Sequence, residues 1–363
     1  MNSVFHGIGL MSGTSLDGLD IAYCHFFNNQ GSWSYEIDVV SCITFPESLL
    51  TQLKSAPKLD SETLLQLDIH YGSWIGEQVN QFVSQNNIRP QFISSHGYTV
   101  FHQPNNNFTH QIGSGDAIYA ITQIPVINNF RQLDVCLGGQ GAPLVPIGDE
   151  LLFDDFDVCL NIGGITNLSF NEKNKRYAYD ICAANMVLNH LAEMKMMPFD
   201  KGGSMARSGS FIPGFYQKLE ELAYYKEPFP KSLGFEWVNK NIFNLNYFNE
   251  NSAEDLAHTF IAHIANRIKV ACSAIDLPKS SKKKILITGG GSHNEYLLES
   301  IRNSLSEQFQ IIKPNNKLID YKEAVIFAFL GLLRLKGETN VLKSVTGASK
   351  NSSSGNLTGK IVF

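Results

Sequence analysis

The stretch MSGTSLDG, residues 11–18, places glycines, hydroxyl side chains and a carboxylate between two apolar runs. A hairpin turn needs only two to five residues, so this insert holds more polar groups than a turn requires. Glycine backbone N–H groups and hydroxyls can bind an anion, and a carboxylate can hold a cation. The stretch predicts either a phosphate-binding turn or an ordinary polar turn. Its candidate residues are Ser12, Gly13, Thr14, Ser15, Asp17 and Gly18.

Two further glycine turns follow apolar runs, NIGG at 161–164 and TGGG at 288–291. A phosphate needs N–H donors without an obstructing Cβ, often with a helix start behind them. Three such turns in one chain favour nucleotide binding; the alternative is three tight connections of an α/β protein. The first two also share a strand–turn–strand layout, a weak internal repeat. The added candidates are Asn161, Gly163, Gly164, Thr166, Asn167, Gly289, Gly290 and Gly291.

Asp180 ends a short predicted strand, 177–179, and precedes a helix predicted over 183–191. A carboxylate at a strand end is well placed to act as a general base. The alternative is that Asp180 caps the helix that follows.

Several polar residues of the first part of the chain, and one near its end, could contact a substrate. His96 follows a predicted strand, where it could bond a sugar hydroxyl or the backbone. Arg131 could bind a carboxylate with its two-pronged guanidinium, or pair with Asp134 three residues later. Asp116 lies in a polar turn, and Glu323 is a conspicuous acid in the first turn of an apolar helix.

The elements that must position these residues alternate between strand and helix, which favours a layered α/β architecture. Helical spacing over 61–87 predicts a helix capped by Ser61, and Asn294 is a possible cap of another. The predicted strands are 4–11, 19–27, 34–45, 91–97, 124–130, a pair within 156–170, and the run after 283; the other helices are 115–123, 183–191, one after 294, and 320–337.

A chain of 363 residues is long for one core and predicts two domains. The glycine- and proline-rich passage 131–153 suggests a junction, so we expect domains over 1–133 and 134–346. Whether the tail, 347–363, packs back on the first domain is left open. The formal charge of −5 argues against nucleic-acid binding. No apolar run is long enough for a membrane span, and six scattered cysteines predict neither disulfides nor a zinc site, so we expect a cytoplasmic protein.

Seven blocks resemble the 1,6-anhydro-N-acetylmuramic acid kinases and occur in the same order as in that family: LMSGTSLDGLDIA, SSHGYTVFHQP, QIGSGDAIYA, NNFRQLDVCLGGQGAPLVP, LNIGGITNL, ITGGGSHN and EAVIFAFLG. The resemblance implies a two-domain actin-like ATPase (ribonuclease H-like) α/β fold with an interdomain active-site cleft. It implies a homodimer that uses ATP and Mg²⁺. It also implies hydrolytic opening of the anhydro sugar and phosphorylation of O6, in peptidoglycan recycling.

The resemblance also implies roles for the candidate residues. Residues 12–18 and 161–167 correspond to two phosphate-binding hairpins, 289–291 to the adenosine loop, and Asp180 to the catalytic base. Substrate contacts are implied for His96, Asp116, Arg131, Asp134 and Glu323, and Asp17 is our choice as a Mg²⁺ ligand. The family's aspartate is usually followed by TGPGN, whereas this chain has ICAAN. Two alternatives stay open: a kinase of an ordinary sugar hydroxyl, and a nucleotide-binding pseudokinase that senses cell-wall fragments.

Overall fold

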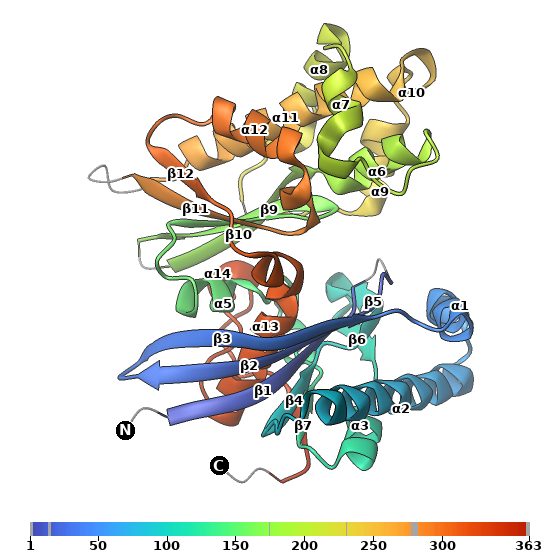
Figure 1. Cartoon of the computed structure of the whole chain (residues 1–363), viewed down its shortest axis with the longest axis vertical. Helices are drawn as coiled ribbons and strands as arrows, with labels where there is room; N and C mark the ends of the chain where they lie inside the picture. Colours follow the sequence, from blue (N-terminus) through green and yellow to red (C-terminus); the bar gives the residue numbers. More distant parts are fainter. Residues whose placement is uncertain (1–2, 14–15, 174, 230, 277–281, 361–363) are drawn as a thin grey trace. The chain divides into compact units, whose positions relative to one another are not determined.

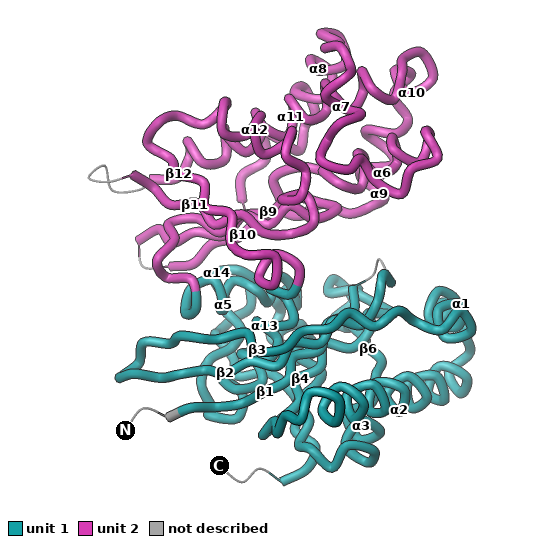
Figure 2. The backbone as a smooth tube through the Cα atoms, viewed as in Figure 1, with its two compact units in different colours: residues 1–152, 321–363 teal, residues 153–320 magenta. Residues whose placement is uncertain are grey.

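The computed structural model divides into two compact units, which Figure 2 draws in two colours. Unit 1 comprises residues 1–152 and 321–363, and unit 2 comprises residues 153–320. The residues that the structure describes are 3–13, 16–173, 175–229, 231–276 and 282–360.

Unit 1 contains a six-stranded sheet in the order β13-β7-β4-β1-β2-β3. The first three strands form an antiparallel meander, β4 and β7 continue parallel to β1, and β13 is antiparallel to β7. The carboxyl ends of β1, β4 and β7 therefore meet at one edge, where ligand-binding residues of α/β sheets gather. The strands are β1 Ser3–Met11, β2 Leu19–Asn29, β3 Ser32–Ile43, β4 Phe92–Ser95, β7 Val126–Asn128 and β13 Asn356–Thr358; β5 Tyr98–Gln103 and β6 Phe108–Ile112 form a separate hairpin.

Helices pack on both faces of this sheet. Ile8 and Leu10 point toward α2 and share a core with its residues, whereas Gly9 points the other way. A Cβ at Gly9 would collide with the Ala324 carbonyl, so a glycine lets α13 pack directly on β1. The helices of this unit are α1 Glu47–Ser55, α2 Ser61–Asn86, α3 Gly115–Thr122, α4 Gln132–Cys136, α5 Pro146–Leu151, α14 Lys343–Thr346 and most of α13 Asn316–Leu335.

The predicted domain boundaries, 133/134 and 346/347, differ from the division seen in the structure. Residues 134–152 stay with unit 1, and the chain returns to unit 1 at Tyr321. The return follows from the packing of α13, where the Ser94 hydroxyl donates to the Phe327 carbonyl. The tail belongs to unit 1 as well, because β13 pairs with β7.

Unit 2 repeats the same strand plan in a five-stranded sheet ordered β10-β9-β8-β11-β12. Its first three strands form an antiparallel meander, and β11 and β12 run parallel to β8. The repeat suggested by the two glycine turns is therefore present in the fold, and the predicted two-part α/β architecture is confirmed. The strands are β8 Val158–Ile162, β9 Ile165–Glu172, β10 Lys175–Ala183, β11 Lys283–Thr288 and β12 Phe309–Ile312.

The core of unit 2 is built between this sheet and the helices that cover it (Figure 1). Helix α11 contributes Leu256, Phe260 and Ile264, all fully buried. The helices are α6 Asn185–Glu193, α7 Ser204–Ser208, α8 Pro213–Glu220, α9 Phe235–Val238, α10 Tyr247–Glu250, α11 Ala253–Ser273 and α12 Glu295–Ser304. Within the described parts of the chain, no helix combines the length and apolar character that a membrane crossing needs.

Side-chain caps set the starts of two predicted helices. Asn294 caps α12 as predicted, accepting a hydrogen bond from the Leu297 backbone N–H. Helix α2 begins at Ser61, but its cap is Asp60, whose carboxylate accepts from the Thr63 N–H. The predicted Ser61 cap is wrong by one residue.

Candidate active site

Described residues on either side of the β1–β2 turn bond to each other and to neighbouring elements. The Leu16 N–H donates to the Gly13 carbonyl at 3.1 Å. The buried Ser12 hydroxyl donates to the Gly97 carbonyl and bonds the Tyr71 hydroxyl at 2.8 Å. The Ser12 side chain thus ties the end of β1 to α2 and to the connection between β4 and β5. Two other candidates of this turn, Thr14 and Ser15, lie outside the described residues.

The carboxylates of Asp17 and Asp20 lie at the end of the same turn, near Cys42. Burial, a hydrogen bond to Asp20 and the nearby charge of Asp17 together raise the pKa of Cys42 to about 12. Gly18 is required here, because a Cβ would lie 2.8 Å from the Cys42 sulfur. Within the described residues no three His, Cys, Asp or Glu side chains gather as a metal site. Mg²⁺ commonly takes only one or two carboxylates, with phosphate and water as its other ligands, and the exposed Asp17 fits such a site.

The edge of the unit 1 sheet carries a polar cluster built around Arg131. Its Nε and Nη2 lie 3.0 and 2.9 Å from Nε2 of His96, and its Nη1 donates to the Gly141 carbonyl at 2.7 Å. The other imidazole nitrogen, Nδ1, lies 2.8 Å from the Gly97 carbonyl. His96 is therefore neutral, with its proton on Nδ1, because Nε2 must accept from Arg131. Burial and the Arg131 charge lower the pKa of His96 to about 3.

The carboxyl of Glu323 interacts electrostatically with the guanidinium of Arg131 in this cluster. Burial raises the pKa of the Glu323 carboxyl, and the Arg131 charge opposes that rise. Burial likewise lowers the pKa of Arg131 to about 10, and Glu323 opposes it. Helix α13 begins at Asn316, so Glu323 lies two turns inside the helix, and its predicted first-turn position is wrong. The cluster offers a cation, a carboxyl and a fixed imidazole, which suits a ligand rich in hydroxyls.

Asp134, an expected substrate contact, lies inside the protein. Its side chain is fully buried, with Oδ2 accepting from the Gly141 N–H and Oδ1 from the Thr346 hydroxyl, both at 2.8 Å. These bonds brace the glycine-rich loop whose Gly141 carbonyl holds Arg131. Asp134 therefore supports the cluster from behind, and its alternative pairing with Arg131 is not formed.

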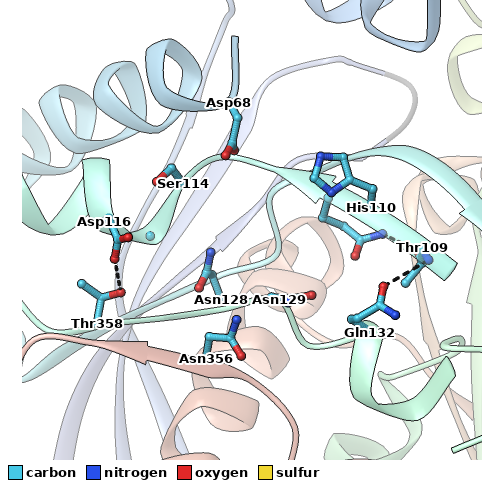
Figure 3. A pocket seen from close by; sticks show the side chains of 12 residues that line it. Asp68, Thr109, His110, Ser114, Asp116, Asn128, Asn129, Gln132, Asn356 and Thr358 are labelled. Atoms are coloured by element: carbon cyan, nitrogen blue, oxygen red, sulfur yellow. Dashed lines mark hydrogen bonds between the residues drawn. The ribbon is translucent and has the colours of Figure 1, made fainter. Parts of the chain in front are cut away.

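Asp116 also lies apart from the cluster, in a pocket of about 490 Å³ shown in Figure 3. Its Oδ1 accepts from the Thr358 hydroxyl at 2.6 Å, which ties α3 to the C-terminal tail. Neither His96 nor Arg131 lines this pocket, so the structure does not bring Asp116 to their side chains. The lining residues are Asp68, Thr109, His110, Gln111, Ser114, Gly115, Asp116, Asn128, Asn129, Gln132, Asn356 and Thr358.

In unit 2, Asp180 lies inside β10, where the pairing with β9 slips. Asp180 pairs with Asn167, but Cys182 pairs with Thr166, so the strand bulges between them. A bulge turns side chains away from the regular alternation and is common beside active sites. The predicted strand end at Tyr179 is therefore wrong, and so is the capping alternative, because Ala184 precedes α6 without any side-chain cap.

Burial raises the pKa of Asp180 to about 6, partly offset by a hydrogen bond from the Leu233 N–H to Oδ2 at 2.8 Å. A carboxyl with such a pKa is mostly ionised at neutral pH and is a stronger base than an exposed aspartate. This is the tuning expected of a general base.

The turn between β8 and β9 is anchored on the start of α6, directly after Asp180's strand. The Gly163 carbonyl accepts from the Asn185 N–H at 3.1 Å, and the Gly164 carbonyl accepts from the Ala184 N–H at 2.8 Å. A Cβ at Gly163 or Gly164 would meet nothing closer than 3.5 Å, so one side of the turn is open. Asn161 and Asn167 face each other across the hairpin, next to the buried Thr166.

The third glycine turn lies directly on the second. Gly289 has a φ of +83°, and a Cβ there would lie 2.6 Å from Oδ1 of Asn161. A Cβ at Gly291 would collide with Ile162, whereas Gly290 is exposed and faces Asn185. Within unit 2, two glycine turns and the Asp180 strand thus meet around Asn185. Exposed glycine backbone beside a helix start fits a phosphate-bearing ligand.

The ICAAN stretch, 181–185, stands beside Asp180 where the family usually has TGPGN. None of its residues has a positive φ, and Ala184 has a φ of −140°. Cys182 and Ala184 stand where the family has its two glycines, and Ala184 combines this φ with a ψ of −101°. This pair of angles lies outside the main regions that L-residues favour.

Sequence reasoning missed the residues that hold Asp180. Leu233 bonds the carboxylate through its backbone N–H, and Tyr224 bonds the Asp180 carbonyl. Every residue type except proline has a backbone N–H, so the identity of Leu233 does not indicate this bond. Tyr224 lies 44 positions from Asp180 in the chain. Neither carries a motif that could have identified it.

Comparison with known proteins adds an independent finding. The family model described as anhydro-N-acetylmuramic acid kinase matches residues 6–360. The relative of that name from Francisella tularensis subsp. novicida is 34% identical over 96% of this chain and 97% of its own, and that from Actinobacillus pleuropneumoniae serotype 5b is 34% identical over 94% and 96%. The activator of 2-hydroxyisocaproyl-CoA dehydratase from Clostridium difficile, solved with bound ADPNP, has a TM-score of 0.41 at 12% identity, covering 92% of this chain and 97% of its own. The chain belongs to the anhydro-N-acetylmuramic acid kinase family.

Proposed function

We propose that this protein is an ATP-dependent kinase that opens 1,6-anhydro-N-acetylmuramic acid with water and phosphorylates O6, giving N-acetylmuramic acid 6-phosphate for peptidoglycan recycling. The observation that carries the proposal is Asp180, a largely buried carboxylate with a raised pKa beside two glycine turns. A family match over nearly the whole chain supports it.

Asp180 acts as the general base of this reaction. Its carboxylate takes a proton from a water molecule whose oxygen bonds to C1 of the sugar, and the C1–O6 bond breaks. O6 then bonds to the γ-phosphorus of ATP, and ADP leaves. A base of this kind typically contributes about 10²–10⁴-fold to the rate. Its raised pKa makes Asp180 a better proton acceptor while keeping it ionised at neutral pH.

The glycine turns donate backbone N–H groups to the phosphates of ATP. In this proposal the turn at 12–18 and the turn at 161–167 hold the phosphates, and 289–291 holds the adenosine. Mg²⁺, when bound, neutralises charge on the transferred phosphoryl group. Asp17 is the residue proposed to help hold it.

The sugar is proposed to bind Arg131 and Glu323, with His96 holding Arg131 in position. Arg131 suits the lactyl carboxylate, because a guanidinium binds a carboxylate through two parallel bonds. The neutral His96, with its orientation set by Arg131 and Gly97, keeps that guanidinium in place. Asp116 and Asp134 are left out of the sugar site, because their carboxylates are engaged elsewhere.

A coupled ADP-release assay tests the function. It compares 1,6-anhydro-N-acetylmuramic acid with N-acetylglucosamine and glucose, using the wild type, Asp180→Asn and the exposed Asp155→Asn as matched control. We expect turnover of the anhydro sugar alone, lost in Asp180→Asn and kept in Asp155→Asn. Turnover of a plain sugar would identify an ordinary sugar kinase. ATP binding without any turnover would identify a sensor.

The cellular setting and assembly are proposed with the function. ATP use and six free cysteines suit the cytoplasm, where thiols stay reduced.

We also propose a homodimer, since α2 exposes Leu65 and Ile69, which are 62% and 52% accessible. Light scattering on the wild type and on Leu65→Glu tests it: a dimer through this face would become monomeric.

A further inference from the structure

A segment that follows α8 contacts Asp180 at three separate atoms. The Tyr224 hydroxyl donates to the Asp180 carbonyl at 2.7 Å, and the Asp180 N–H donates to the Lys231 carbonyl at 3.2 Å. The Leu233 N–H donates to Oδ2 of the carboxylate at 2.8 Å. Tyr224 belongs to the short 3-10 helix η4, Ala223–Lys226.

These bonds compensate for the position of Asp180 in the sheet. Strand β10 is at the edge of its sheet, so its outward N–H and C=O groups have no strand partner. At Asp180 both groups are taken by the segment, immediately before the bulge toward Cys182. The backbone N–H and C=O of Asp180 are therefore held by Lys231 and Tyr224, on the side of β10 that faces away from β9.

Lys231 ties the two ends of the segment together. Its Nζ donates to the Tyr224 carbonyl at 2.9 Å and lies 4.5 Å from the centre of the Tyr224 ring. The same ammonium lies 5.9 Å from the ring of Tyr179, the residue before Asp180. An ammonium over aromatic faces adds attraction to the hydrogen bond.

We propose that Tyr224, Lys231 and Leu233 are positioning residues that aim the Asp180 carboxylate, with Oδ2 held and Oδ1 presented to the reacting water. Within the described residues, Oδ1 accepts no hydrogen bond, which leaves it as the basic oxygen. The inference rests on the proposed function, because it assumes that Asp180 is the base. It adds which groups orient the base and which of its two oxygens takes the proton.

The groups that face Asp180 keep a constant charge near neutral pH. Burial raises the pKa of Tyr224 above its usual value and raises that of Cys182 to about 12, so both stay protonated. Lys231 directs its ammonium to Tyr224. Among the groups that contact Asp180, the carboxyl itself is therefore the one whose charge changes near pH 6.

The first test compares Tyr224→Phe with Tyr225→Phe. The two tyrosines are neighbours in η4, but the Tyr225 hydroxyl bonds His263 at 2.9 Å and does not touch Asp180. Tyr224→Phe should lower kcat about 10- to 100-fold with little change in KM, because a misplaced base slows chemistry without weakening binding. The acid limb of the pH–rate profile of Tyr224→Phe should move up by about half a pH unit. The reason is that a weaker bond from the Leu233 N–H to Oδ2 favours the protonated Asp180 carboxyl.

Tyr225→Phe should leave both kcat and the acid limb near their wild-type values. Lys231→Met should behave like Tyr224→Phe, and Lys231→Arg should recover most of the loss, since a guanidinium can still donate to the Tyr224 carbonyl. Equal effects of Tyr224→Phe and Tyr225→Phe, or an unmoved acid limb in Tyr224→Phe, would overturn the proposal.

A second readout needs no turnover. NMR titration of ¹³C-labelled aspartate, with the Asp180 signal identified by its loss in Asp180→Asn, measures the pKa of Asp180 directly. Tyr224→Phe should raise that pKa and Tyr225→Phe should not. If the wild type phosphorylates no sugar, the proposed function fails, while this titration still decides whether Tyr224 holds the carboxylate.

Discussion

Asp180→Asn should inactivate the enzyme and at the same time stabilise its fold. The reason is the pKa of Asp180, which burial raises to about 6 from the value near 3.9 of an exposed aspartate. A difference of about two pH units corresponds to about 3 kcal/mol of unfavourable ionisation in the folded chain. The neutral asparagine avoids this cost, and its amide oxygen can still accept from the Leu233 N–H.

The sign of this effect depends on pH. Below about pH 4 the carboxyl is protonated in both the folded and the unfolded chain, so its ionisation costs nothing. As pH rises from 4 to 6 the unfolded carboxyl ionises before the folded one, and the cost grows until it is complete above pH 6. Asp180→Asn should therefore stabilise at pH 7.5 and have almost no effect at pH 4.

Thermal unfolding of the full chain measures this difference. For a unit the size of unit 2, each kcal/mol shifts Tm by about 2–4 °C, so the variant should unfold roughly 5–10 °C above the wild type at pH 7.5. Asp155→Asn, with an exposed carboxyl, is the control and should not shift Tm. A destabilised Asp180→Asn, or an equal gain at both pH values, would refute burial as the cause of the raised pKa.

Three further predictions follow from the same geometry. The kcat/KM for the sugar should fall about tenfold per pH unit below about pH 6, because Asp180 accepts a proton only when ionised; a flat profile down to pH 5 would contradict this. Gly289→Ala should cost about 1–3 kcal/mol in urea unfolding, since its φ is +83° and a Cβ would press on the neighbouring turn, whereas the exposed Gly290→Ala should change stability by less than about 0.5 kcal/mol. Thr346→Val should cost about 1–3 kcal/mol by leaving the buried Asp134 short of a donor, and Thr346→Ser should restore most of it.

Much of the fold could be predicted because its signals are local. Apolar runs broken by glycine turns identified the meander strands of both units, and helical spacing identified α2. The boundary between units could not be found this way. It depends on α13 packing against β1, a long-range contact that a single glycine, Gly9, makes possible.

The site was predicted in part for the same reason. Asp180 and the glycine turns carry motifs, but the bulge that aims Asp180 arises from pairing with β9 and has no local sequence signal. Asp134 has the residue type of a ligand contact, yet its burial and its partners Gly141 and Thr346 depend on loop packing. Residue type therefore indicated which groups could react, and only packing decided which of them are free to do so.

An oxygen-18 tracer tests the central claim most directly. The reaction is run in H₂¹⁸O with 1,6-anhydro-N-acetylmuramic acid and ATP, and the product is analysed by mass spectrometry beside unlabelled product incubated in the same water. If water activated by Asp180 opens the ring, each product molecule carries one ¹⁸O at C1, beyond the exchange seen in the control, and none in its phosphate. Product without label at C1, or with label in the phosphate, would contradict the account.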